Sequence, residues 1–176
     1  MATKLEFINR TEVTDGVVTV NVDNVFSSEY QSYQIIFDGI FHNLNISNGI
    51  EGIRFIDNSG SVISGSEYEY AVHNILANSS FTETRSTSAT EIQLVMIADQ
   101  LSDGQANGVL TVYKPNDSSS FTFTNFQGMG KNSSQPRGQR AVGVHKNAET
   151  IRGFQFVETN SGRPFGGGSI ITYGIR

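Results

Sequence analysis

Apolar and polar residues alternate over short stretches of this chain, and each stretch ends in small polar residues. The clearest alternating sets are Val18, Val20 and Val22; Tyr33, Ile35 and Phe37; and Ile171, Tyr173 and Ile175. A period of two is typical of β-strands that bury one face. The pattern predicts strands over residues 4–9, 17–22, 33–41, 53–56, 91–98, 108–114, 121–126, 140–146, 149–158 and 168–175.

Turn signals separate these strands at intervals of about 8 to 15 residues, the spacing of β-sandwiches. Asp15-Gly16 and the run from Asp57 to Gly60 are such signals, because Gly accepts positive φ and Asp or Asn tolerates it. In the stretch 149–158 the apolar phase slips at Gly153, which predicts a β-bulge. We expect an all-β, antiparallel two-sheet sandwich of jelly-roll type, with residues 1–176 forming a single domain.

Four segments depart from the alternation. The stretch 23–32 carries Phe26 and Tyr30 at helical spacing and predicts a short helical turn that covers one end of the sandwich. The stretch 66–77 predicts a second short helix. The polar stretch 78–90 and the Gly-rich stretch 127–139 contain few apolar residues and predict loops.

Composition narrows the function classes. The chain has 18 Gly, 12 Phe, 6 Tyr, no Cys and only 16% charged residues. The aromatic content disfavours disorder, and the lack of Cys excludes disulfides, thiolate metal sites and cysteine nucleophiles. The first ten residues lack a signal-peptide core and no stretch has membrane-helix length, so we expect folding in a cytosol and no membrane insertion.

Charge is unevenly divided along the chain. Residues 1–130 hold 5 basic and 15 acidic residues, whereas residues 131–176 hold 7 basic and 2 acidic residues. Interleaved strands from the two parts would mix these charges in space, whereas separate packing would create an acidic and a basic pole. The net charge of −5 disfavours nucleic-acid binding in either case.

No catalytic pattern stands out. His42, His73 and His145 are far apart, and none belongs to an HxH or HxxxH pair. The sequence Gly128-Met129-Gly130-Lys131 lacks the spacer and the ending of a phosphate-binding loop. We therefore predict no catalytic residues, no metal and no cofactor. A hydrolase would require paired carboxylates in a cleft, and the acidic residues here are scattered.

Several stretches resemble small virion proteins of tailed bacteriophages. The best match is Gly167–Ile175, which resembles a closing Gly-Gly-x-Ile-x-x-Tyr-Gly-Ile strand, and 151–154 resembles the strand before it. Ser27–Ile35 resembles an opening Ser-x-x-Tyr-x-x-Tyr-x-Ile stretch, although many members carry a Trp there. Residues 54–60 resemble the strand and turn that follow.

The resemblance implies a jelly-roll-like tail-fibre, head-fibre or capsid-decoration protein of the virion, assembled in the host cytoplasm. It implies a homo-oligomer, with a trimer favoured, that packs against other virion proteins. It transfers no site residues, because the matching motifs are structural.

Our first functional hypothesis is thus a non-enzymatic virion protein that acts through subunit packing. The stretches 127–140 and 163–165 supply the interface candidates, which are Met129, Lys131, Arg137, Arg140, Arg163 and Phe165. The stretch 78–90 is a further candidate loop. The alternative is a carbohydrate-binding module for host-surface glycans. It predicts exposed aromatic residues on one face, with Tyr68, Tyr70 and Tyr113 as candidates, although most Phe residues are expected in the core.

Overall fold

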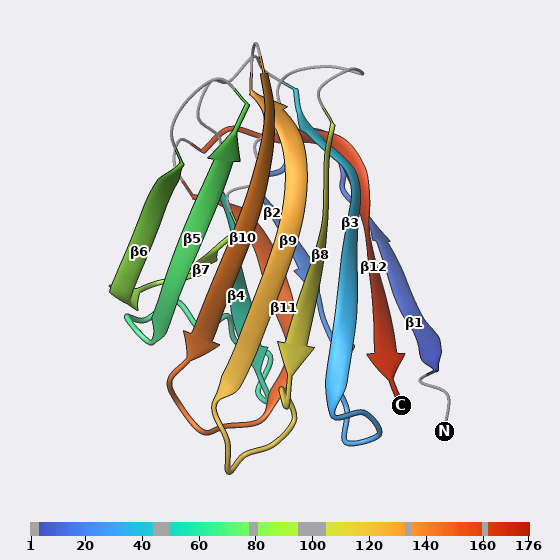
Figure 1. Ribbon diagram of the computed structural model, residues 1–176. Coiled ribbons are helices and arrows are strands. Elements are labelled where there is room, and N and C mark those ends of the chain that lie inside the picture. Colours follow the sequence, from blue (N-terminus) through green and yellow to red (C-terminus); the bar gives the residue numbers. More distant parts are fainter. Residues whose placement is uncertain (1–3, 44–49, 78–80, 95–104, 133–134, 160–161) are drawn as a thin grey trace.

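The computed structural model describes residues 4–43, 50–77, 81–94, 105–132, 135–159 and 162–176. Within these ranges the chain forms twelve β-strands and no helix. The strands build two antiparallel sheets, one of eight strands and one of four, which pack face to face (Figure 1). The prediction of an all-β two-sheet sandwich is confirmed.

The larger sheet has the strand order β1-β12-β3-β8-β9-β10-β5-β6. Its strands are β1 (Leu5–Glu12), β12 (Phe165–Ile175), β3 (Ser32–His42), β8 (Ala106–Tyr113), β9 (Thr122–Asn132), β10 (Gln135–His145), β5 (Tyr68–Leu76) and β6 (Thr82–Ala89). The smaller sheet has the order β2-β11-β4-β7. Its strands are β2 (Thr19–Val22), β11 (Ile151–Glu158), β4 (Glu51–Asp57) and β7 (Ile92–Gln93).

The chain crosses between the sheets at most connections. It alternates between them from β1 to β5 and again from β10 to β12, as in a jelly roll, whereas β8, β9 and β10 remain neighbours in one sheet. Strands from the basic C-terminal part of the chain are therefore interleaved with strands from the acidic part, with β12 between β1 and β3 and β11 between β2 and β4. Of the two charge arrangements, the structure has the mixed one, and Arg152 pairs with Asp23 across β11 and β2.

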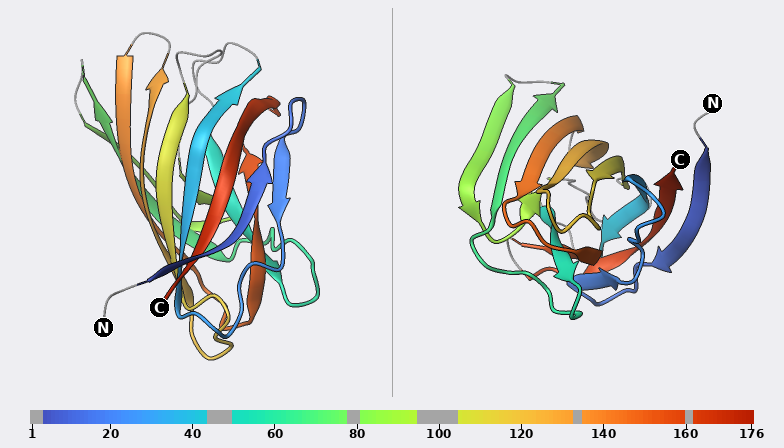
Figure 2. Two further views of the ribbon diagram at one scale, coloured as in Figure 1. Left: turned by 90° about the vertical axis from the view of Figure 1, so that its right-hand side faces the viewer. Right: turned by 90° about the horizontal axis from the view of Figure 1, so that it is seen from below.

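The buried side chains form one cluster between the sheets. Phe37 and Phe126 point into it from the larger sheet, and Phe156 points into it from the smaller one. The ring centroid of Phe37 lies 6.3 Å from that of Phe126 and 5.0 Å from that of Phe156. Figure 2 shows the smaller sheet lying against only one side of the larger one. The other side of the eight-stranded sheet is not covered by any described element.

Two paired glycines make room for the core ring of Phe126. Gly108 and Gly128 face each other across β8 and β9, and a Cβ atom on either would clash with that ring. The low apolar content of residues 127–139 predicted a loop, but residues 127–132 belong to β9 and residues 135–139 belong to β10. Neighbouring strands on both sides satisfy their backbone groups, so the strands form without an apolar face of their own.

Both predicted helices are absent. Residues 68–76 form β5, in which Tyr68 and Val72 face the core, because β-branched and aromatic residues favour an extended, paired backbone. The segment 23–31 is an irregular turn held by Tyr33, whose hydroxyl donates to the carbonyl oxygen of Ser27 over 2.8 Å. Its predicted covering role holds, because Phe26 and Tyr30 are buried in the core cluster.

Two further predictions have mixed outcomes. The predicted polar loop 78–90 contains the edge strand β6, which is almost entirely exposed. Of the predicted strand 91–98, Ile92 and Gln93 form β7, and residues 95–98 lie outside the described ranges. The predicted bulge at Gly153 is confirmed by a register shift between β11 and β4. No described helix is long and apolar enough to cross a membrane.

The core position of Phe165 gives a first prediction. Its side chain has 0% exposure and stacks on Phe156 with ring centroids 4.9 Å apart. Phe165→Ala should lower the free energy of unfolding by about 3–5 kcal/mol, because it removes core contacts and leaves a cavity. Urea unfolding monitored by circular dichroism at low protein concentration measures this loss.

The matched control is Phe123→Ala, which makes the same change at an exposed position of β9. It should change the free energy of unfolding by less than about 1 kcal/mol. Equal losses in the two variants would contradict the assignment of Phe165 to the core.

Candidate interaction surface

Strand pleating divides the side chains of the larger sheet between the core and the uncovered side, which we call the outer face. In β9, the buried Thr122, Thr124 and Phe126 alternate with exposed residues such as Phe123. The outer face is turned toward the viewer in Figure 1. Its apolar members with substantial exposure are Leu5, Phe7, Ile75, Val109, Tyr113, Phe123, Met129 and Val142.

Strand register brings these residues into rows that cross the sheet. One row joins Tyr113 of β8 to Phe123 of β9 and Val144 of β10. The row through the other half of the sheet joins Val109 to Ile36 of β3 and then to Ile171 of β12. Neighbours in a row lie about 5 Å apart, so the side chains of each row form an apolar strip. The polar residues Gln34, Thr111 and Asn125 form the row between the two strips.

On β1 and β12 the same surface continues to the edge of the sheet. Phe7 pairs with Tyr173, and their rings meet edge to face with centroids 6.0 Å apart. Leu5 pairs with Ile175 in the next outward-facing row. Six adjacent strands of the larger sheet thus contribute apolar side chains to the outer face, in the order β1, β12, β3, β8, β9 and β10.

The outer face is hollowed where β5 and β10 lie between β6 and β9. Two adjoining hollows of about 340 and 410 Å³ share Ala71, Arg85 and Val142 as lining residues. We call them together the groove. Phe123 lines one hollow, and Asn125 and Arg140 line the other. The groove therefore combines an apolar floor with polar and charged walls.

The predicted interface residues fall into three environments. Met129 is 64% exposed and Arg140 is exposed, and both lie on the outer face. Lys131 is half-buried near the end of β9. The remaining candidates, Arg137, Arg163 and Phe165, are not freely exposed.

Arg137 points to the inner side of the sheet, where its Nη2 donates to Oδ1 of Asn74 over 2.7 Å. Burial lowers the pKa of its guanidinium group. Arg163 is half-buried, and its backbone N–H donates to Oε2 of Glu158 over 3.1 Å. Phe165 is buried in the core, so its choice as an interface residue is wrong. The sequence placed it in a turn after Pro164, whereas it begins β12.

Sequence reasoning missed the exposed aromatic residue of β9. The stretch 121–126 was correctly predicted as a strand paired with β8, but its Phe residues were assigned to the core as a class. Phe123 and Phe126 are three positions apart, so a strand must place them on opposite faces. Among the tyrosines considered for sugar stacking, Tyr68 is buried, Tyr70 is half-buried and Tyr113 is exposed.

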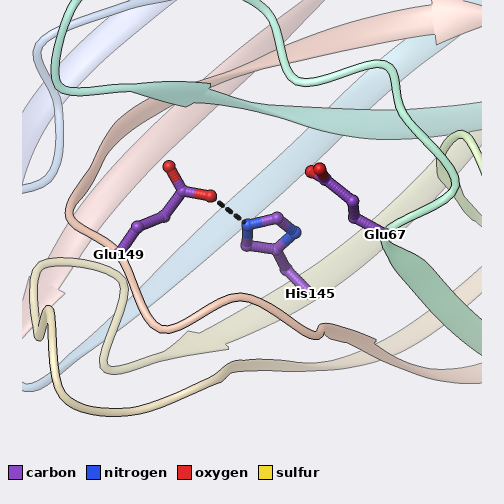
Figure 3. A group of neighbouring side chains, drawn as sticks. All are labelled: Glu67, His145 and Glu149. Carbon is purple, nitrogen blue, oxygen red and sulfur yellow. Dashed lines mark hydrogen bonds and ion pairs between the residues drawn. The ribbon is translucent and has the colours of Figure 1, made fainter.

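The structure also places two of the three histidines next to carboxylates that sequence reasoning had not paired with them. Nε2 of His42 lies 2.6 Å from Oε1 of Glu51, with both side chains fully buried. Nε2 of His145 lies 2.8 Å from Oε1 of Glu149, and Glu67 completes a group around this ring (Figure 3). The four-residue spacing from His145 to Glu149 is the sequence feature that could have indicated the second group. That the chain has no catalytic residues stays a prediction.

The surroundings of the buried pair shift the pKa values of both of its members. Burial opposes protonation of His42, but the neighbouring Glu51 carboxylate raises the pKa of the imidazole above its usual 6.5. Burial also raises the pKa of Glu51, against the effect of His42. Both groups hold protons more strongly in the folded protein than in the unfolded chain.

Comparisons with known proteins give little further information. No family model and no curated protein sequence matches the chain. Among solved structures, the chain is similar to the CBM2 module of the evolved Dit of Lactobacillus casei BL23 phage J-1, with 8% sequence identity and a TM-score of 0.27. The match covers 89% of this chain and 68% of that chain. A TM-score this low does not support an argument about fold or function.

The raised pKa values of His42 and Glu51 predict a loss of stability toward alkaline pH. The contribution of His42 is complete below its unfolded pKa, near 6.5, and is lost as pH rises through the higher folded value. The contribution of Glu51 changes in the same direction. The free energy of unfolding, measured with urea from pH 6 to 9, should therefore decrease.

The double variant His42→Gln with Glu51→Gln should flatten this decrease, since the pair no longer titrates. His73→Gln is the control, because His73 is exposed on the outer face. An unchanged slope in the double variant would show that other groups cause the pH dependence.

Proposed function

We propose that this protein is a non-enzymatic structural component of a bacteriophage particle that acts by packing against other subunits. The observation that carries the proposal is the outer face, where six adjacent strands leave apolar side chains exposed or half-exposed. Clusters of exposed apolar side chains mark interaction sites in soluble proteins. The resemblance of Gly167–Ile175 to the closing strand of small virion proteins supports the assignment to a phage particle.

The size of the outer face is sufficient for a specific interface. Six strands about 4.8 Å apart span roughly 29 Å, and five residues along a strand span roughly 17 Å. The projected area of the outer face is thus about 500 Å² per copy, and protruding side chains add to it. Two such faces would bury about 1,000 Å², which is near the minimum for a biological interface.

A second copy of the chain is the partner that we favour for this surface. An antiparallel sheet can stack on another sheet about 10 Å away through interdigitated apolar side chains, as the two sheets already do within the chain. Two outer faces stacked on each other would form a dimer. The resemblance to virion proteins favours a trimer, and the molar mass distinguishes the two. Other virion proteins would bind the remaining surfaces, and the protein would be assembled into the virion in the host cytoplasm.

Self-association through the outer face can be tested by light scattering at two concentrations. The wild type should give a stable multiple of 19.2 kDa. The double variant Phe123→Asp with Val142→Asp should weaken association at least 100-fold, because it buries charges in the apolar centre of the interface. Its circular dichroism spectrum should stay unchanged, since both side chains are more than half exposed.

The control is Thr19→Asp with Asn21→Asp, which adds the same charges to exposed positions of β2 in the other sheet. This control should associate like the wild type. A wild type that remains monomeric, or an outer-face variant that associates normally, would contradict self-packing through this face.

A second candidate function is the binding of a host-surface glycan, and the groove favours it. Phe123 offers a ring for sugar stacking, and Arg85, Arg140 and Asn125 offer hydrogen-bond donors within the same groove. A glycan array should then give signals that Arg85→Ala abolishes, while the fold is unaffected. The absence of any signal at millimolar glycan would eliminate this candidate.

A further inference from the structure

A group of ionisable side chains is assembled where the chain leaves the larger sheet for the smaller one. His145 is the last residue of β10, and Glu149 lies in the connection to β11. Glu67 immediately precedes β5, and its carbonyl oxygen accepts a hydrogen bond from the backbone N–H of Lys146 over 2.9 Å. Pairing of β5 with β10 thus fixes Glu67 beside the end of β10.

The geometry of this group suits a metal ion. One ligand atom from each of Glu67, His145 and Glu149 lies within 4.8 Å of the other two. Ligand atoms placed about 2.1 Å from a tetrahedral metal are about 3.4 Å apart. The present separations of up to 4.8 Å must therefore shorten to enclose a cation, and the Glu149 carboxylate must exchange its hydrogen bond with Nε2 for the ion. Figure 3 shows the two carboxylate groups converging near the imidazole ring.

The state of His145 is a second, independent sign of an additional ligand. Its side chain is fully buried, and its Nδ1 atom has no hydrogen-bond partner. In Figure 3 this nitrogen lies on the side of Glu67. Buried polar atoms in folded proteins are nearly always hydrogen-bonded or bound to an ion. An unpaired nitrogen facing a carboxylate is a position that a cation can bridge.

The charge around the ring supports the same conclusion. Among the described residues, no Lys or Arg side chain forms an ion pair with Glu67 or Glu149. The neighbouring Lys146 pairs with Glu69 over 3.3 Å. Two carboxylates with one imidazole and no other counter-charge repel each other, and a divalent cation would neutralise both.

We propose that Glu67, His145 and Glu149 form a binding site for a divalent transition-metal ion of the zinc class. The three side chains supply one nitrogen and two oxygen ligands, and water completes the coordination. An imidazole ligand favours zinc and its neighbours over calcium or magnesium, which prefer oxygen ligands alone. Uptake of the ion releases any proton on the coordinating nitrogen.

The site has a route to solvent and a consequence for the fold. Glu149 also lines an open hollow of about 410 Å³, together with Asp57, Asn58 and Ser59, through which an ion can enter. A bound ion would join the start of β5, the end of β10 and the connection to β11. It would thereby fasten the two sheets together at this end of the sandwich. This inference is independent of the function proposed above.

Calorimetric titration of EDTA-treated, dialysed protein with zinc chloride tests the site. We expect one ion per chain with a dissociation constant in the micromolar range. The melting temperature should rise by roughly 5 °C at saturation, because the ion binds only the folded state. Calcium chloride at the same concentration should produce neither effect. Because substitution of the buried His145 can itself unfold the protein, the test variant is Glu67→Gln with Glu149→Gln.

This double variant should bind zinc at least 100-fold more weakly while keeping the circular dichroism spectrum of the wild type. The matched control is Glu69→Gln, which removes a carboxylate two residues from Glu67 that pairs with Lys146 instead. The control should bind like the wild type. The absence of zinc binding up to 1 mM would overturn the proposal, as would equal affinity of the double variant and the wild type.

Discussion

The structure depends on one constraint, which is that a sheet of eight strands has only a smaller sheet to cover it. Side chains alternate across each strand, so every strand of the larger sheet presents half of its residues to each side. The smaller sheet and the turn carrying Phe26 and Tyr30 cover one of those sides. Apolar residues on the other side, such as Phe123 and Val142, then remain exposed for as long as the chain is alone. Core packing and the candidate interaction surface are thus two sides of one sheet.

Local patterns predicted most of the strands, because alternation is a property of neighbouring residues. The strands around Tyr33, Leu110 and Phe156 and the bulge at Gly153 were found from such patterns. Where prediction failed, the deciding information lies elsewhere in the chain. The stretch 127–139 has almost no apolar residues, yet its described parts, residues 127–132 and 135–139, are strands that pair with β8 on one side and β5 on the other. The stretch 66–77 has apolar residues at helical spacing, but pairing with β10 and β6 makes it a strand.

The candidate surface was only partly predictable for the same reason. Met129 and Arg140 were correctly placed on a surface, although the expected loop is a hairpin. Phe165 was misplaced, because Pro164 indicated a turn and gave no sign of the partners that bury the ring. Phe126 is the ring that faces the core, where Gly108 of another strand leaves room for it. That information exists only after β8 and β9 have paired.

The ionisable group at His145 follows from the same pairing, and it lies at a mechanically important point. The β10–β11 connection is one of the places where the chain passes from the larger sheet to the smaller one. The pleat of β10 turns His145 inward, and the connection that follows brings Glu149 back over the ring. The β5–β10 register adds Glu67 from a segment almost eighty residues earlier. An ion held there would act on the contact between the sheets, whereas a subunit packed on the outer face would act on the opposite side of the larger sheet. The two events therefore stabilise different parts of the same sandwich, and neither requires the other.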